Sequence, residues 1–298
     1  MTADTRVLVL GGTGVDTVVY IPRLGVAGID SCVVPAIVRR AGQTGDNVAV
    51  GLAALGLPVS LIDHVGDDHE GELVRALHRR SGVSLMPVDA PHGTKRAVSL
   101  VDPSGRRLSF FDGSRTAGDP LPEELVAQLA EPATHAHVSI TFPCQHALPT
   151  LIRSGVVIST DLHDWNGSDA YHEEFAYQAD IVFLSAVALT DHEATMRRIV
   201  ERGRARVVVA TAGARGGYVL AEGDGAVRAF AAATPPAPVV DSNGAGDAFA
   251  TGFLFGQLSG ADLDTCLAYG TVAGAHAVTV PATEVDPIGR DALLRLGR

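Results

Sequence analysis

The sequence has few of the residues that build disulfide frameworks and zinc sites. Its 298 residues include three cysteines, Cys32, Cys144 and Cys266, which lie far apart and form no CxxC pair. This spacing predicts neither a set of disulfide bonds nor a tetrahedral zinc site. We expect three apolar thiols buried in the fold, and reduced cysteines of this kind fit a cytoplasmic location.

Excess positive charge, a targeting segment and a membrane span are also lacking. The formal net charge is −11, whereas a general nucleic-acid-binding protein would present a basic face. No stretch reaches the roughly 18 uninterrupted apolar residues of a membrane helix. The N-terminal residues run into a strand-like segment without the pattern of a signal peptide. We therefore expect a cytoplasmic protein that binds neither nucleic acid nor a membrane.

Two common nucleotide-binding motifs are missing as well. The chain contains no GxxxxGK[ST] segment, which argues against a P-loop kinase. Gly12 and Gly14 follow the first apolar run and fit the first two positions of a GxGxxG motif, but Thr17 stands at the third. The dinucleotide fingerprint is therefore incomplete, which disfavours a dinucleotide-binding enzyme.

The chain does contain enough apolar material for a large core, since 46% of its residues are hydrophobic. Short apolar runs typical of strands buried on both faces alternate with helix-compatible stretches. This alternation predicts an α/β fold with a mostly parallel sheet and helices on both faces, forming one domain over residues 1–298. The predicted strands are 7–10, 59–62, 137–140, 156–159, 181–184 and 207–210, and the predicted helices are 46–55, 71–80, 123–129, 171–178 and 191–201.

Four short strands fall outside this alternation. Segments 15–20 and 31–39 follow the first predicted strand, and segments 95–101 and 106–111 flank the turn sequence Asp-Pro-Ser-Gly. Strands without helices between them predict a small accessory sheet, inserted in the domain at about residues 15–40 and 94–112. We interpret this sheet as a lid over an active site, and two edge hairpins without a gating role are the alternative.

The residues most informative about chemistry lie at 241–247, where Asp-Ser-Asn-Gly-Ala-Gly-Asp precedes an apolar, helix-compatible segment. Gly244, Ala245 and Gly246 let backbone N–H groups approach an anion, and a helix beginning there adds the positive end of its dipole. Asp247 would stand beside that anion, where a carboxylate can accept a hydroxyl proton during phosphoryl transfer. A turn with an N-capping aspartate is the simpler alternative for these residues alone.

This segment closely resembles the DTxGAGD signature of PfkB-type carbohydrate kinases, with Ser242 in the place of the usual threonine. Residues 42–49 and the GxDxxG segment 66–71 resemble the N-terminal signature of the same family. The agreement extends from Gly11 to about Pro281. The resemblance implies a ribokinase-like three-layer α/β/α sandwich with a small β-sheet lid. It also implies an ATP-dependent transfer of phosphate to a hydroxyl of a sugar or nucleoside.

The resemblance further implies roles for individual residues. Asp247 would be the catalytic base, and Gly244, Ala245 and Gly246 would form the anion hole. Asp16 would bind two substrate hydroxyls, which a carboxylate can do because it accepts several hydrogen bonds. Gly42, Gln43 and Asn47 would add substrate contacts, and we expect Arg96 on the lid to meet any acidic or phosphate group of the substrate.

The nucleotide is expected near a second group of residues. Segment 211–217 resembles the family's TxGxxG segment, which implies that Thr211, Gly213 and Gly216 lie near the ATP phosphates. His276 stands where the family often places a residue beside the adenine. Ser185 occupies the first position of the family's N-x-x-E motif, which is linked to phosphate and magnesium.

Two departures from the family pattern concern the lid hinge and Mg²⁺, and one agreement concerns a second metal ion. Gln43 replaces the second glycine of a hinge pair, so it would stiffen the hinge or add a polar substrate contact. Ser185 and Ala188 replace both side chains of the N-x-x-E motif, so Mg²⁺ would be held through water, by ATP or by other carboxylates such as Asp161. Asp241 matches an aspartate with which some relatives bind a monovalent cation such as K⁺.

The substrate class stays open at the level of the sequence. We favour a sugar, because Phe110 and Phe111 would point to opposite faces of a strand and would not together form an aromatic surface for a nucleobase. An adenosine-type nucleoside kinase of the same fold is the first alternative. A non-catalytic sensor descended from such a kinase is the second, although it would have no need of Asp247. The lid edges could also pair two chains into a homodimer.

Overall fold

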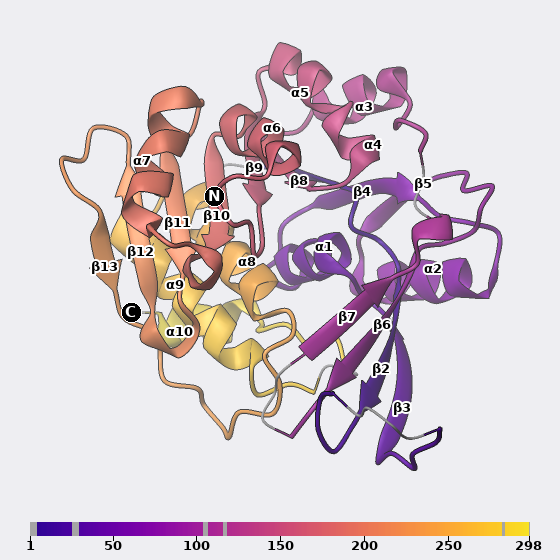
Figure 1. The fold of residues 1–298 in the computed structure, drawn as a ribbon. Helices are drawn as coiled ribbons and strands as arrows, with labels where there is room; N and C mark the ends of the chain where they lie inside the picture. Colours follow the sequence, from indigo (N-terminus) through magenta and orange to yellow (C-terminus); the bar gives the residue numbers. More distant parts are fainter. Residues whose placement is uncertain (1–4, 26–29, 104–106, 116–117, 282–283, 298) are drawn as a thin grey trace.

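The computed structural model describes residues 5–25, 30–103, 107–115, 118–281 and 284–297. A nine-stranded sheet forms the centre of the chain, and a separate four-stranded sheet projects from one side of it (Figure 1). The predicted α/β fold with a mostly parallel central sheet and a small accessory sheet is confirmed. None of the helices in the described ranges is both long and apolar enough to cross a membrane.

The large sheet places the ends of its parallel strands along one edge. The last two strands in chain order lie at one end of this sheet and run antiparallel to their neighbours. All other neighbouring strands run parallel to each other. Loops that follow parallel strands collect at the carboxyl edge of a sheet, where α/β enzymes bind their ligands. The strands are β1 (Val7–Leu10), β4 (Val59–His64), β5 (Ser84–Val88), β8 (His135–Ser139), β9 (Val157–Asp161), β10 (Ile181–Ser185), β11 (Val207–Thr211), β12 (Gly217–Ala221) and β13 (Arg228–Phe230), in the spatial order β13-β12-β11-β10-β9-β8-β1-β4-β5.

Helices cover both faces of this sheet, as the resemblance implied. Val7 and Val9 of β1 point into one buried cluster, and Leu8 and Leu10 point into the other. The first cluster lies under α1 (Thr44–Ala54), α2 (His69–Ser81), α8 (Ala245–Leu258), α9 (Leu263–Ala277) and α10 (Arg290–Leu296). The second lies under α3 (Glu123–Ala130), α4 (Phe142–Gln145), α5 (Leu148–Ser154), α6 (Ala170–Gln178) and α7 (His192–Arg202).

Helix α8 is buried between α1 and α9, which fixes the position of its first turn. A Cβ atom added at Gly252 would lie 2.4 Å from the carbonyl oxygen of Tyr269 on α9. Glycine is therefore required there for the two helices to pack this closely. Because the helix axis is held in this way, the residues at its N-terminus are held as well.

The accessory sheet, here called the lid, has the strand order β3-β2-β6-β7. Its strands are β2 (Val15–Tyr20), β3 (Ala36–Ala41), β6 (Arg96–Val101) and β7 (Arg107–Phe111). The pair β2 and β6 is parallel, and the outer pairs are antiparallel. Strand β3 begins at Ala36, later than predicted, because residues 31–35 form no regular structure.

The register of the lid strands decides which side chains share a face. Asp16 lies opposite Arg40 and Ala97, and Ala97 lies opposite Phe111. Residues paired in this way project from the same side of a sheet, here called the Asp16 face. That face also carries Val18, Ser99, Ser109 and Arg107, whereas Ile37, Val98, Leu108 and Phe110 belong to the opposite face.

A buried carboxylate on β4 holds two of the points where the chain enters the lid. The backbone N–H of Thr13, just before β2, donates to Asp63 Oδ2 at 2.9 Å. The ammonium group of Lys95, just before β6, donates to both oxygens of Asp63 at 2.9 and 2.8 Å. Burial lowers the pKa of Lys95, but the charge and hydrogen bonds of Asp63 outweigh it and raise that pKa overall.

A second buried carboxylate holds the point where the chain leaves β3. Asp46 Oδ2 accepts hydrogen bonds from the backbone N–H groups of Gln43 at 3.0 Å and Gly14 at 3.1 Å. Asp46 Oδ1 contacts His78 Nε2 of α2 at 2.7 Å, and both side chains are fully enclosed. Asp46 therefore ties the beginning of β2 and the end of β3 to the same buried pair.

Asp68 anchors the second hairpin of the lid. It accepts hydrogen bonds from the backbone N–H of Thr94 at 2.9 Å, from the Thr94 hydroxyl at 2.7 Å and from Arg115 at 2.9 Å. Partial burial opposes ionisation, but these donors, the N–H of Gly71 and the Arg115 charge lower the pKa of Asp68 to about 2. All four connections between the lid and the body are thus held by carboxylates of the body.

Candidate active site

The N-terminus of α8 presents the backbone geometry of an anion site. Gly244 precedes the helix with φ of 71°, a left-handed conformation that favours glycine. The N–H groups of Gly246 and Asp247 fall in the first turn, where a helix has no internal partner for them. The Ala245 N–H has a weak contact to the Ser242 carbonyl at 3.4 Å. These donors and the helix dipole favour a negatively charged group at this point.

The Asp247 carboxylate lies at the same helix start and is oriented by α1. Its Oδ1 accepts a hydrogen bond from the Thr44 hydroxyl at 2.7 Å, and its Oδ2 accepts one from the Asn47 amide at 2.8 Å. Each oxygen keeps further acceptor capacity, so the carboxylate can still receive a proton from a bound hydroxyl. Asp247 is largely buried, which limits its access to solvent.

Asp16 lies on strand β2 of the lid and contacts Gln43, next to Thr44. Gln43 Nε2 donates to Asp16 Oδ1 at 3.1 Å. Burial raises the pKa of Asp16, and the Gln43 hydrogen bond together with the charges of Arg40 and Arg107 opposes this rise. Gln43 therefore contacts Asp16, the carboxylate expected to bind the substrate. A glycine at position 43 could not make this contact.

Arg107 is the lid arginine that reaches the start of α8. Its guanidinium donates to the side-chain oxygen of Asn243, next to the expected anion hole. Arg40 contacts the Glu284 carbonyl oxygen at 3.1 Å. Arg96, which we expected to meet an acidic substrate group, belongs to the other face and pairs with Asp112 at 2.8 Å. Its geometry therefore does not support a substrate role.

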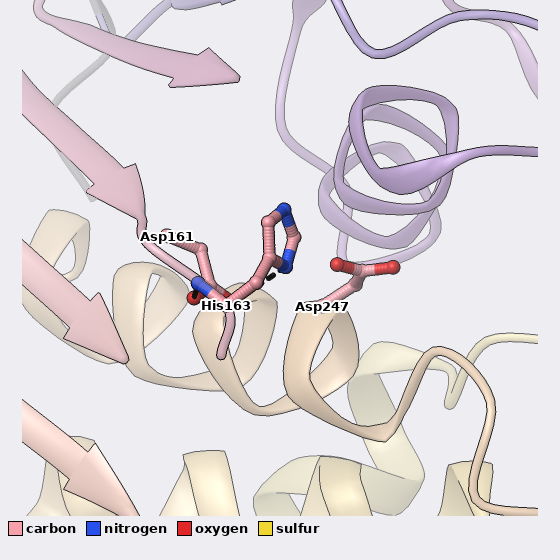
Figure 2. A group of neighbouring side chains, drawn as sticks. All are labelled: Asp161, His163 and Asp247. Atoms are coloured by element: carbon pink, nitrogen blue, oxygen red, sulfur yellow. Dashed lines mark hydrogen bonds and ion pairs between the residues drawn. The ribbon is translucent and has the colours of Figure 1, made fainter. Parts of the chain in front are cut away.

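Asp161, His163 and Asp247 form a cluster of potential metal ligands (Figure 2). One ligand atom from each lies within 4.8 Å of the others. Asp161 ends β9 and His163 lies in the turn that follows, and both face the start of α8. His163 adopts φ of 51°, unusual for a residue with a side chain. Burial and the nearby Asp247 raise the pKa of Asp161, against the lowering effect of His163. Carboxylate oxygens in such a cluster can approach a divalent cation.

The residues expected near the nucleotide lie at the ends of neighbouring strands. Ser185 of β10 and Thr211 of β11 are partners in the strand register, so they reach the carboxyl edge of the sheet together. Gly213 and Gly216 follow in a short turn, with φ of 59° and 85°. A Cβ atom at Gly216 would lie 1.9 Å from the carbonyl oxygen of Phe230, so glycine is required there.

His276 and Asp241 lie near the segment that leads into α8. His276 Nε2 contacts the Asp286 carbonyl oxygen at 3.0 Å, and its ring lines a cleft together with Asn47 and Asn243. The ring is thus fixed by the C-terminal segment. Asp241 Oδ1 accepts the Asn243 N–H at 2.7 Å, whereas its buried Oδ2 has no hydrogen-bond partner among the described residues.

Sequence reasoning missed three residues of this region. Thr44 follows Gln43 directly, but its contact with Asp247 joins positions 203 residues apart. Arg107 and His163 were also overlooked as site residues, because strand register and a left-handed backbone bring them to the site. The unusual His-Asp-Trp sequence after Leu162 was the only available signal for His163.

The chain matches the pfkB family of carbohydrate kinases over residues 4–288. It is 57% identical over 296 residues to the acarbose 7(IV)-phosphotransferase of an Actinoplanes species, with 99% of each chain covered. It is 31% identical over 240 residues to the fructoselysine 6-kinase of Escherichia coli, covering 80% of this chain and 89% of the relative.

Solved structures agree with these sequence matches. A microbiome-derived acarbose kinase, Mak1, superposes with a TM-score of 0.92 at 38% identity, covering 98% of this chain and 99% of the other. The ribokinase of Arabidopsis thaliana, solved with ribose and ATP, shares the fold with a TM-score of 0.81 at 20% identity and 99% coverage of both chains. The chain therefore belongs to the pfkB family of carbohydrate kinases and is an ATP-dependent sugar kinase with the ribokinase-like fold.

Proposed function

We propose that this kinase phosphorylates acarbose or a closely similar pseudo-oligosaccharide, with Asp247 as the general base. The substrate is supported by the 57% identity, over nearly the full length, to a relative named for acarbose phosphorylation. The role of Asp247 is supported by its place in the first turn of α8, beside the N–H groups of that turn, and by the two donors that orient it. The same similarity favours catalysis over a non-catalytic sensor.

Residues of this chain can bind the acceptor, accept its proton and stabilise the phosphoryl group during transfer. Asp16 accepts hydrogen bonds from acceptor hydroxyls and places one of them near Asp247. That oxygen attacks the γ-phosphorus of ATP while the bond from phosphorus to the bridging oxygen breaks and ADP leaves. Asp247 receives the hydroxyl proton, and the N–H groups of Gly246 and Asp247 stabilise charge on the transferring group.

Mg²⁺ would accompany ATP, as phosphoryl transfer requires, and would neutralise phosphate charge when bound. Asp161 fits this role because it is a buried carboxylate whose Oδ2 lies 4.0 Å from His163 Nδ1 and which has a ligand atom within 4.8 Å of one of Asp247. Ser185 and Thr211 would lie beside the phosphates at the neighbouring strand ends. The unpartnered Oδ2 of Asp241 would be compensated by a monovalent cation such as K⁺.

Two further expectations belong to this proposal. We expect the enzyme to act in the cytoplasm, where ATP and reduced thiols are available. We also expect a homodimer through the lid, because its edge strands β3 and β7 can pair with a second chain. Light scattering of the purified chain tests the dimer, and a monomer mass would exclude it.

The proposed substrate is tested by ADP release with MgATP and a panel of acceptors. The panel contains acarbose, maltotriose, glucose, ribose, fructoselysine and adenosine, and phosphorus NMR of the product locates the new phosphate. We expect the highest kcat/KM with acarbose and a single phosphate monoester on one ring. A higher kcat/KM with adenosine would favour the nucleoside-kinase alternative, and preference for a monosaccharide would refute the oligosaccharide assignment.

A further inference from the structure

An oligosaccharide acceptor needs more room than the reacting centre supplies. The name of the 57% identical relative specifies position 7 of a ring numbered IV, so the other rings of that substrate must lie outside the point of transfer. In this chain the starts of α1 and α8 close one side of Asp247, and the turn after β9 closes another. Strand β7 is one of the two edge strands of the lid, and its Arg107 reaches Asn243 just before α8.

The register places an aromatic side chain on β7 in line with Asp16. Asp16 on β2, Ala97 on β6 and Phe111 on β7 form one row across the Asp16 face. Neighbouring strands lie about 4.8 Å apart, so Phe111 is about 10 Å from Asp16 across the sheet. That distance suits a ring one or two positions along an oligosaccharide bound at Asp16. Ala97 between them has no bulky side chain to block this path.

Phe111 is available for such a contact. Its side chain is 75% exposed, although it lies on the face that carries Asp16. It makes no ring contact with another aromatic residue of the described ranges. In the next row of the same face, the hydroxyls of Ser99 and Ser109 lie 2.9 Å apart. An exposed aromatic ring beside hydroxyl groups suits a sugar, which has an apolar C–H face and polar edges.

We propose that Phe111 is the platform of a second acceptor subsite, on which a ring adjacent to the phosphorylated ring stacks. This inference rests on the proposed oligosaccharide substrate and adds the residue that recognises its length. Phe111 contributes to binding in the ground state and in the transition state equally, because it lies away from the reacting atoms. Its loss therefore raises KM and leaves kcat unchanged.

The test compares Phe111→Ala with the matched control Phe110→Ala. Phe110 is the preceding residue on the same strand, is 55% exposed and belongs to the opposite face. Both variants remove an exposed aromatic ring, so neither is expected to prevent folding. Initial rates are measured with acarbose and with the single ring IV that carries its acceptor position.

For Phe111→Ala we expect KM for acarbose to rise about tenfold, equivalent to about 1.4 kcal/mol, with kcat within about twofold of the wild type. KM for the single ring should not change, and Phe110→Ala should match the wild type with both acceptors. Phe111→Trp should retain the wild-type KM, because it keeps an aromatic platform.

Three results would overturn the inference. The first is an unchanged KM for acarbose in Phe111→Ala, the second is an equal increase for both acceptors, and the third is the same increase in Phe110→Ala. Failure of the proposed function looks different, since the wild-type enzyme would then prefer adenosine, a monosaccharide or the single ring to acarbose. That outcome would remove the need for a second subsite together with the proposed substrate.

Discussion

The ion pair between Lys95 and Asp63 gives the most quantitative test of how the lid is held. Replacing Lys95 by methionine keeps most of the side-chain volume and removes the charge that faces Asp63. Asp63 is fully enclosed, and the Lys95 side chain is 14% exposed. The variant would leave a buried carboxylate without its counter-charge at the point where two chain segments enter the lid.

The magnitude follows from the partners that Asp63 retains. Breaking a buried ion pair by removing one partner destabilises a protein by about 3–5 kcal/mol. Asp63 would keep hydrogen bonds from the N–H groups of Thr13 and His64, so we expect a loss near the lower limit, about 3 kcal/mol. Because the folded-state pKa of Lys95 is raised, this contribution is fully present below pH about 10.5 and is lost as the pH rises above the folded value.

Urea unfolding at neutral pH measures this difference for Lys95→Met against the wild type. Arg79→Ala serves as the control, because its pair with Glu72 is more than half exposed on both sides and should contribute little to stability. The double variant Asp63→Asn/Lys95→Met should be more stable than Lys95→Met, since it removes the unpaired charge. A loss below about 1 kcal/mol in Lys95→Met would show that this pair does not hold the lid.

Three further predictions concern the site and the lid anchors. Asp16→Asn should raise KM for the acceptor at least tenfold with a smaller change in kcat, and an unchanged KM would remove Asp16 from the substrate site. Because burial raises the pKa of Asp16, the wild-type KM should begin to increase on acidification at a higher pH than for an ordinary aspartate. Thr44→Val should lower kcat about tenfold without raising KM, because it frees one oxygen of Asp247, and an unchanged kcat would show that this contact is not needed. Asp68→Asn should be about 1–2 kcal/mol less stable than the wild type at pH 7, since the carboxylate is partly exposed. Its folded pKa of about 2 lies below the ordinary value, so this difference should shrink as the pH falls from about 4 to 2, and a constant difference would refute the role of the charge.

Much of the fold was predictable because buried parallel strands leave a local signal. The apolar runs at β1, β4, β10 and β11 agree closely with the observed strands, since a strand covered on both faces needs apolar residues at consecutive positions. Strand β3 was placed too early, because it lies in the half-exposed lid. Its exposure alternates along the strand, but its sequence does not alternate apolar and polar residues in step with that exposure.

For the site as well, features formed by neighbouring residues could be predicted from the sequence, whereas contacts between distant residues could not. The turn before α8 was predictable because glycine, small residues and aspartate in order specify an anion-binding helix start. The choice between Arg96 and Arg107 was not, because it depends on the register between β6 and β7 and on which face of the lid turns toward α8. Likewise, Gln43 could be seen as a departure from glycine, but only the folded chain brings it to Asp16.

The role of Asp247 is the central claim, and one variant tests it most directly. In Asp247→Asn the side chain keeps its size, and the Thr44 hydroxyl can reverse to accept a hydrogen bond from the new amide. We measure ADP release with saturating MgATP and acarbose, together with calorimetric binding of acarbose. The account predicts a fall in kcat of about a thousandfold, while acarbose binds within about threefold of its wild-type affinity. Turnover within tenfold of the wild type would contradict the assignment of Asp247 as the general base.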